Sequence, residues 1–202
     1  MENNIILYPR KVLLIPAKEI TEITPEIKLA VDKLRRLMYK KDGYGVAAPQ
    51  IDFGYQIFIM NPDPYNVGQR ANNEMVCINP TITEHGNFTT QEVEGCLSIP
   101  NFFATVERFK AIKVKYLNLD LEEVEVTLDG SVAPIIFQHE LDHLRGKLIV
   151  DYATDTELTA QKGILTGLEK QEKFRQYQAS ELKAPINKKR KKTNKKLRIK
   201  KH

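Results

Sequence analysis

The segment from Gln138 to Gly146, QHELDHLRG, holds two of the four histidines of the chain. On an α-helix, His139 and His143 would lie on one face with their Cβ atoms about 5–6 Å apart, so both rings could reach one metal ion. Glu140 would project from the neighbouring flank, where a carboxylate can take a proton from a water activated by that metal. The pattern therefore predicts a metal-dependent hydrolase.

Two histidines do not complete such a site, because a catalytic metal generally has three protein ligands and one position open for water. Cys96, in the segment QEVEGCLSIP, follows an expected strand edge, and its soft thiolate could supply the missing ligand. A lone cysteine is more often a small buried apolar residue, which is how we interpret Cys77 in the run MVCIN. If the chain were instead a zinc metallopeptidase, Glu157 or Glu169 would complete the site.

Periodicity and turn residues predict the elements that position these side chains. Pro134 fits the first turn of the metal-site helix, and Gly146 fits its C-terminal stop. Alternating apolar residues predict a β-hairpin over 111–119 and 122–128. Shorter strands are predicted at 56–60 and 75–79, and His85 is placed in a polar turn without a role.

The N-terminal third predicts a helix that covers a sheet. Residues 4–16 read as extended apolar segments broken by prolines. Thr24 is a good N-cap with Pro25 at the first helical position, and an amphipathic pattern follows. The glycines of GYGVAAPQ at 43–50 would let a substrate or another chain approach the backbone closely, although a plain turn between helix and strand is the alternative.

Composition bounds the class of protein. With 202 residues and 42% hydrophobic content, the chain can bury one core, so we expect one domain with appendages. No apolar run approaches the length of a membrane-spanning helix, and the N-terminus does not resemble a secretory signal. Two cysteines make a disulfide framework unexpected. We therefore expect a reduced, cytoplasmic setting and no membrane association.

The net charge of +5 belongs to the C-terminal end. Ten lysines and arginines and no acid lie between Lys188 and Lys201, so the rest of the chain carries about −5. Residues 154–183 read as one helix, with Leu158, Ile164, Leu165 and Leu168 as its apolar positions. We expect a catalytic domain over 1–153, a C-terminal helix over 154–185 and a basic, disordered tail over 186–202.

Three separated segments, GYGVAAPQ at 43–50, EGCLS at 94–98 and QHELDH at 138–143, together resemble peptide deformylase. Members of that family remove the formyl group from the N-terminal formylmethionine of newly synthesised polypeptides and release formate. The resemblance extends from about Tyr8 to Asp151. It implies an α+β fold in which mixed or antiparallel β-sheets pack around a central metal-binding helix, followed here by the C-terminal helix and basic tail.

The resemblance also implies the ligands and the general base. Cys96, His139 and His143 would hold one metal ion with water in the fourth position. Glu140 would activate this water and then protonate the leaving amine. Cysteine and two histidines as ligands suggest zinc, whereas the family is known for Fe²⁺, with Zn²⁺, Ni²⁺ or Co²⁺ as substitutes.

Further roles follow from the resemblance for the oxyanion and the substrate. The side-chain amide of Gln50 and the backbone N–H of Leu97 would form the oxyanion hole. Gly45 would hydrogen-bond a substrate that enters like an added strand. The pocket for the methionine side chain would be lined by Tyr44, Val132, Ile135 and Ile136.

Four features depart from the family pattern, one of them the segment IDFG at 51–54, where the family more often has a short aliphatic-glycine run. Tyr44 would narrow the pocket mouth, Phe103 stands where many members have a basic or polar residue, and Pro134 is unusual ahead of the metal helix. The departures at Tyr44 and Phe103 motivate a second hypothesis, a catalytically silent protein that binds formyl-peptides or the ribosome. Contact of the basic tail with ribosomal RNA is a further hypothesis, with a solubilising tail as its alternative.

Glu94 and Arg108 lie near the cysteine in sequence. We predict that they pair and orient a metal ligand, as groups around a metal site usually do. The alternative is an ordinary surface ion pair.

Overall fold

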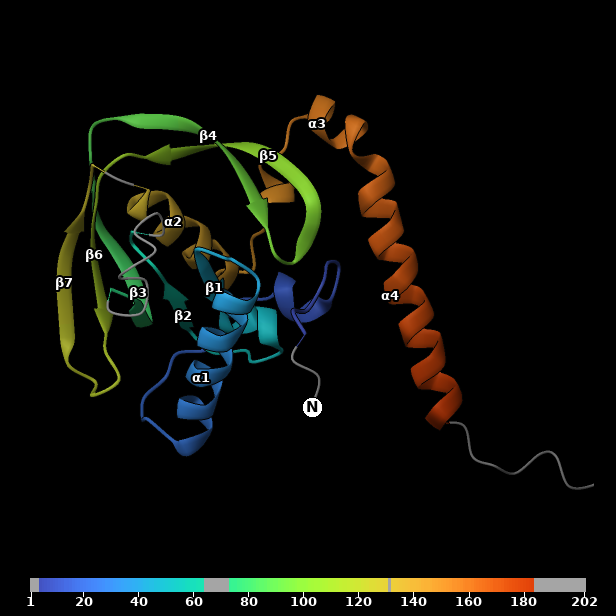
Figure 1. The fold of residues 1–202 in the computed structure, drawn as a ribbon, viewed down its shortest axis with the longest axis horizontal. Coiled ribbons are helices and arrows are strands. Elements are labelled where there is room, and N and C mark those ends of the chain that lie inside the picture. The colour runs from blue at the N-terminus through green and yellow to red at the C-terminus, as the bar shows by residue number, and fades with distance from the viewer. Residues whose placement is uncertain (1–3, 64–72, 131, 184–202) are drawn as a thin grey trace, which may run out of the picture.

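Two antiparallel sheets make up the β-structure of the computed structural model, which describes residues 4–63, 73–130 and 132–183 (Figure 1). The larger sheet has the strand order β1-β2-β3-β6-β7, and β4 pairs with β5 in a separate ribbon. The strands are β1 (Gly45–Ala47), β2 (Ile57–Met60), β3 (Met75–His85), β4 (Thr89–Cys96), β5 (Ile99–Phe109), β6 (Ile112–Leu117) and β7 (Glu123–Leu128). The α+β class with antiparallel sheets is confirmed.

Helices α1 (Pro25–Lys40) and α2 (Ala133–Leu144) cover opposite faces of the larger sheet. Because strand side chains alternate between the two faces, Ile57 and Ile59 pack with α1, while Phe58 and Met60 pack with α2. Both faces are therefore buried, which explains why β2 reads as a continuous apolar run. As predicted, Thr24 caps α1 by accepting a hydrogen bond from the Ile27 N–H.

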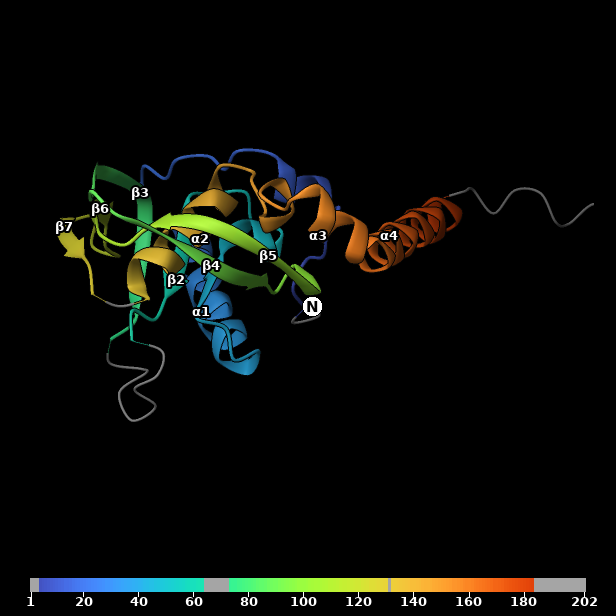
Figure 2. The same ribbon diagram turned by 90° about the horizontal axis from the view of Figure 1, so that it is seen from above.

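A third apolar cluster lies under the β4–β5 ribbon. It includes Leu13 from the 3₁₀ helix Lys11–Leu14, Phe102 from β5 and Leu168 from α4 (Lys162–Lys183). Figures 1 and 2 both place α3 (Asp155–Ala160) and α4 beyond β5, at the side of the molecule away from β7. The C-terminal helices thus pack on the ribbon that carries Cys96.

Helix α2 begins and ends as its sequence predicts. Pro134 lies in its first turn. At the other end, the N–H of Gly146 donates to the carbonyl of His143, and the N–H of Lys147 donates to that of Asp142. This is the Schellman pattern, which needs a left-handed residue, and Gly146 has φ +73°. The terminus that carries His143 is therefore fixed.

Several expected boundaries were wrong. Residues 4–16 include a 3₁₀ helix, and β3 continues to His85, so this histidine ends a strand and does not lie in a turn. The predicted helix over 154–183 is divided at Gln161 into α3 and α4. Strand β5 was not predicted, although its buried residues alternate at Phe102, Ala104, Val106 and Arg108.

The expected tail over 186–202 lies outside the described residues. No helix within the described ranges is long and apolar enough to cross a membrane.

Candidate metal centre and its cavity

The structure brings Cys96, His139 and His143 together, each with one ligand atom within 4.8 Å of the others. The Sγ of Cys96 is 3.3 Å from the Nε2 of His143, and the two histidine rings lie 5.0 Å apart between centroids. Cys96 ends β4, and the histidines are one turn apart on α2. One sulfur and two imidazole nitrogens at these separations fit a catalytic cation with an open position.

Charge at the site favours metal binding. Burial raises the pKa of the Cys96 thiol, but the neighbouring His143 and His139 rings outweigh this effect and bring the pKa down to about 5. The thiolate is the form of cysteine that binds metal. Cys77 differs because it is fully buried in the core, where burial raises its pKa, as expected for a structural residue.

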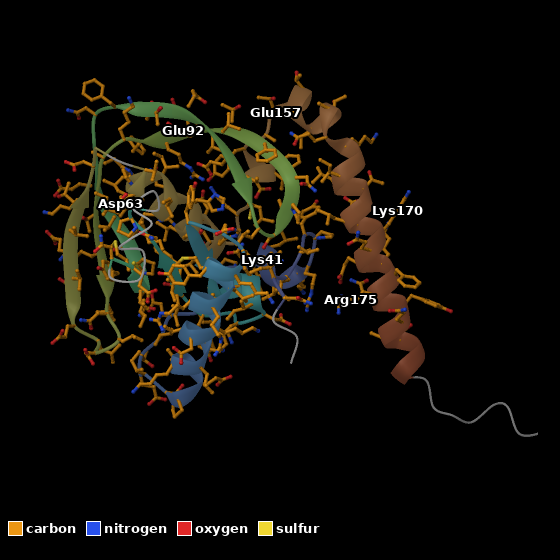
Figure 3. All side chains as sticks on the ribbon, in the orientation of Figure 1. Lys41, Asp63, Glu92, Glu157, Lys170 and Arg175 are labelled. Carbon is orange, nitrogen blue, oxygen red and sulfur yellow. The ribbon has the colours of Figure 1, made fainter. Side chains whose placement is uncertain are left out.

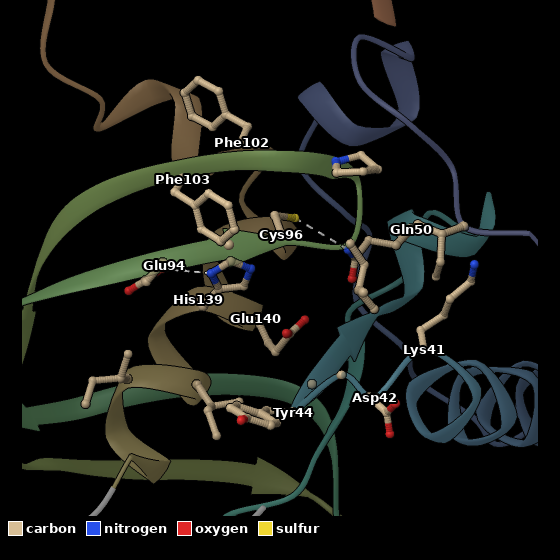
Figure 4. A pocket seen from close by; sticks show the side chains of 18 of the residues that line it. Lys41, Asp42, Tyr44, Gln50, Glu94, Cys96, Phe102, Phe103, His139 and Glu140 are labelled. Carbon is tan, nitrogen blue, oxygen red and sulfur yellow. Dashed lines mark hydrogen bonds and ion pairs between the residues drawn. The ribbon is translucent and has the colours of Figure 1, made fainter. Parts of the chain in front are cut away.

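Glu94 and Arg108 pair as predicted, and the surface alternative is wrong, because their side chains are only 7% and 5% exposed. Arg108 donates from Nε and Nη2 to the two carboxylate oxygens of Glu94, at 2.7 and 2.9 Å. The Oε2 of Glu94 is in turn 2.8 Å from the Nδ1 of His139 (Figure 4). With Nδ1 engaged, His139 presents Nε2 to a metal.

The same network includes two residues that the sequence reasoning missed. Arg108 also donates from Nη1 to Asp142, at 2.6 Å, and the hydroxyl of Tyr152 donates to the same carboxylate oxygen, at 2.9 Å. Burial raises the pKa of Glu94, but its bonds to Arg108 and His139 lower it to about 2. Glu94 is therefore ionised, and the network ties β4 and β5 to α2.

Glu140 is buried beside the ligands, and its Oε2 has no hydrogen-bond partner among the described residues. Burial raises its pKa to about 7, although the two histidines oppose this shift. A Cβ at Gly45 would lie 2.5 Å from the Oε1 of Glu140. The absence of a side chain at position 45 is thus what leaves room for the carboxylate.

Gln50 faces the metal ligands from the 3₁₀ helix Ala48–Ile51, which follows β1. Its Oε1 accepts from the Ala47 N–H at 2.8 Å. Its Nε2 donates to the hydroxyl of Ser98 at 3.0 Å and lies 3.8 Å from the Sγ of Cys96. These contacts fix the amide with its nitrogen beside Cys96. Leu97 follows Cys96 and lines the same cavity.

A cavity of about 860 Å³ is lined by Cys96 and His139, two of the three candidate ligands. All the residues expected to contact substrate line it, together with two exposed apolar residues, Val93 and Phe103, of which Val93 was missed. The expected residues are Tyr44, Gly45, Gln50, Leu97, Val132, Ile135, Ile136 and Glu140. Pockets of about 300–1,000 Å³ are typical of ligand sites.

Neither carboxylate of the metallopeptidase alternative, Glu157 or Glu169, belongs to the metal-type cluster of the described residues. Glu157 accepts hydrogen bonds from Thr105 and Thr154, and the metal-type cluster of the described residues contains Cys96 in its place. His85 packs its ring against Phe109, with 4.2 Å between centroids, outside this cluster.

Comparison with known proteins points to one family. The family model described as polypeptide deformylase matches residues 2–159. A peptide deformylase of Polynucleobacter necessarius is 39% identical over 148 residues, which cover 73% of this chain and 83% of that protein. A peptide deformylase of Thermotoga maritima is 42% identical over 135 residues, or 67% of this chain and 77% of that protein.

Solved structures agree with this similarity. Arabidopsis thaliana peptide deformylase 1B, in complex with an inhibitor, superposes with a TM-score of 0.77 at 33% identity and covers 85% of this chain and 93% of that one. The Plasmodium falciparum peptide deformylase gives a TM-score of 0.76 at 30% identity, covering 88% of this chain and 98% of that chain.

Proposed function

Because the chain belongs to the peptide deformylase family and so is a hydrolase that removes the N-formyl group from newly synthesised polypeptides, we propose how its own residues divide this work. The observation that carries the proposal is the convergence of Cys96, His139 and His143, where Cys96 and His139 line one cavity together with Glu140. The silent binding protein is not favoured, since each proposed ligand and the proposed base are present.

We propose that Cys96, His139 and His143 hold one Fe²⁺ ion per chain, and that Zn²⁺, Ni²⁺ or Co²⁺ can replace it. A cation held by these ligands would supply Lewis-acid chemistry: it would polarise a carbonyl oxygen and lower the pKa of bound water to about 7. The ligand types support a borderline-soft divalent ion. Metal analysis of protein purified without oxygen tests the identity of the ion.

Glu140 acts as general base and then as general acid. Its free Oε2 takes the proton of the attacking water, and a pKa of about 7 suits a group that must then give the proton to the leaving amine. The formyl oxygen, which becomes negative in the transition state, accepts hydrogen bonds from the Gln50 Nε2 and the Leu97 backbone N–H. The contacts of Gln50 with Ala47 and Ser98 support this role, because they hold the amide in place before substrate binds.

Gly45 hydrogen-bonds the substrate backbone, and the methionine side chain binds between Tyr44, Val132, Ile135 and Ile136. The position of Gly45 supports its role in binding the substrate backbone, because Gly45 belongs to the edge strand β1 and lines the cavity. The second role is supported by three aliphatic side chains that line one cavity with Tyr44.

The two cysteines provide the decisive test. Formate release from formyl-Met-Ala-Ser is measured with full-length protein that is loaded with iron under anoxic conditions. Cys96→Ala should lose both metal and activity, because it removes a ligand, whereas Cys77→Ala should keep both. Equal metal content in the two variants would contradict the proposed centre.

Arg108 offers a second test. Arg108→Ala should weaken metal binding about 10- to 100-fold, because the network that orients His139 loses its cation. Unchanged metal content and activity would contradict an orienting role for the Glu94–Arg108 pair.

We further propose a cytoplasmic enzyme whose catalytic domain spans 1–153, followed by a helical segment over 154–185 and a basic tail over 186–202. The family model supports the first boundary because its match ends near it, at residue 159. The ten basic residues of the tail support contact with ribosomal RNA. Truncation after Pro185 should weaken co-sedimentation with ribosomes at low salt, and equal co-sedimentation would contradict the contact.

A further inference from the structure

The outer edge of β5 is covered by side chains from the C-terminal helices, since β4 is its partner in the two-stranded ribbon. The Phe103 N–H donates to the Oε1 of Gln161 at 2.8 Å, and the Nε2 of Gln161 donates to the Phe103 carbonyl at 2.7 Å. These two hydrogen bonds take the place of those that a neighbouring β-strand would form with the backbone of Phe103. Gln161 thus fixes the backbone of Phe103 from the junction between α3 and α4.

A second contact fixes the next outward-facing residue of the strand. Both the N–H and the hydroxyl of Thr105 donate to the Oε1 of Glu157, at 2.8 Å each. Glu157 also accepts from the N–H of Thr154, the N-cap of α3, and so completes the capping box of that helix. Figure 3 shows Glu157 where α3 meets β5. Four hydrogen bonds therefore join the helical junction to the strand at this point.

The ring of Phe103 is directed into the cavity and is still 53% exposed. It lies over the backbone of β4, because a Cβ at Gly95 would be only 3.1 Å from the Cε1 of Phe103. Val93, two residues earlier on the same face of β4, is 72% exposed and lines the same cavity. Together, Phe103 and Val93 form an apolar wall beside the metal ligands.

This wall lies apart from the proposed methionine pocket. Figure 4 shows Phe103 and Tyr44 on opposite sides of His139 and Glu140. The cavity of about 860 Å³ belongs to the upper range of ligand pockets, so it has room for more of the peptide than formylmethionine. Because the wall is continuous with the catalytic cavity, its occupant is the substrate chain beyond the formylated residue.

We propose that Phe103 is a specificity-determining residue that favours an apolar side chain at one of the two positions after formylmethionine, and that Gln161 is the positioning residue that holds it. The inference rests on the proposed function. Gln161 lies beyond residue 159, where the family match ends. Selection of substrate therefore depends on a segment that follows the catalytic domain.

The test compares three peptides, formyl-Met-Ala-Ser, formyl-Met-Leu-Ser and formyl-Met-Ala-Leu, with full-length, iron-loaded protein. The better leucine peptide should have a kcat/KM about five- to tenfold above that of formyl-Met-Ala-Ser, as expected for a partly buried leucine. In Phe103→Ala this ratio should fall to about one, and in Phe103→Leu most of it should remain.

Gln161→Ala should lower the same ratio about two- to threefold, because the ring loses its fixed position, and the change should be in the KM of the leucine peptide. Phe174→Ala is the matched control, since Phe174 is an exposed aromatic residue of α4 that does not line the cavity. It should leave the ratio unchanged.

The outcomes are distinguishable. Formate release without a preference for leucine, or a ratio that survives in Phe103→Ala, would overturn the specificity role and leave deformylation intact. An equal fall for all three peptides in Gln161→Ala would overturn the positioning role. Failure of the wild-type protein to release formate from any peptide would overturn the proposed function itself.

Discussion

Gly45 and Glu140 form a pair at the level of single residues. The carboxylate of Glu140 occupies the space that a side chain at position 45 would need, since a Cβ there would lie 2.5 Å from its Oε1. Because protein interiors are close-packed, a carboxylate displaced from this space would have to find another position. The glycine therefore determines where the general base lies.

Replacing Gly45 with alanine should lower kcat/KM by about 100-fold or more, because the base is pushed out of reach of the attacking water. Metal content should not change, since no ligand is touched. Gly54→Ala is the control, because a Cβ at Gly54 meets nothing within 4 Å. Formate release and metal analysis check both variants, and a fully active Gly45→Ala enzyme would contradict this explanation.

At this scale, the sequence predicted much of the site. The spacing of His139 and His143 required a third ligand, and Cys96 is brought to them. The roles of Asp142 and Tyr152 were not predictable, because Tyr152 reaches Asp142 only after the chain reverses direction at Gly146. Sequence separation alone does not indicate such a contact.

At the level of elements, the end of α2 determines where His143 lies. Gly146 adopts φ +73°, and a Cβ there would lie 2.9 Å from backbone atoms of Leu14 and Ile15. Gly130 has a similar φ of +60°, but a Cβ there meets nothing within 4 Å. An alanine at position 130 would therefore meet only the backbone strain of a positive φ. An alanine at position 146 would meet the same strain and a steric clash as well.

Gly146→Ala should reduce the free energy of unfolding by about 3 kcal/mol or more, while Gly130→Ala should cost only about 1 kcal/mol of left-handed strain. Urea denaturation of the two variants gives this difference directly. Equal losses would show that the contact of Gly146 with the N-terminal segment does not matter for stability.

The contact between α3 and β5 should depend on pH. Hydrogen bonds from Thr154 and Thr105 lower the pKa of Glu157 from 4.5 to about 2. A lowered pKa in the folded state means that this stabilisation is complete above about pH 4.5 and is lost as the pH falls toward 2. Hydrogen exchange at the Thr105 amide should therefore accelerate relative to that of other β5 amides as the pH falls below 4.5.

Glu157→Gln should remove this pH dependence, since the amide oxygen still accepts hydrogen bonds but cannot be protonated in this range. A wild-type protein whose Thr105 amide shows the same pH profile as the variant would rule out Glu157 as the titrating group.

The helices and strands that the sequence predicted best are those in which one residue pattern is clear. The hairpin β6–β7 alternates clearly, and α1 has both a cap and a proline at its start. Strand β3 was predicted too short because Pro80 and polar residues interrupt it, and its pairing with β6 shifts register at that point. A proline at such an irregularity is tolerated, but the shift follows from tertiary packing.

On the scale of the whole molecule, three apolar clusters join the sheets and helices, and the C-terminal helix belongs to one of them. Leu168 of α4 is 8% exposed and packs with residues under the β4–β5 ribbon, whereas Phe174, two turns further, is 61% exposed. The first half of α4 is therefore part of the folded body.

Leu168→Ala should cost about 2–3 kcal/mol of unfolding free energy, as for other buried leucines. Phe174→Ala should change the free energy by less than about 0.5 kcal/mol. Thermal and urea unfolding of both variants provide the comparison, and similar stabilities would mean that α4 is dispensable for the fold.

Strand β1 lies at an edge of the larger sheet. A strand edge that is open to peptides can also recruit other copies of the same chain, and long flat edges promote aggregation. Here the edge strand has only three residues and begins with glycine. It can pair with one extended peptide, but it is too short to template the stacking of strands into fibrils.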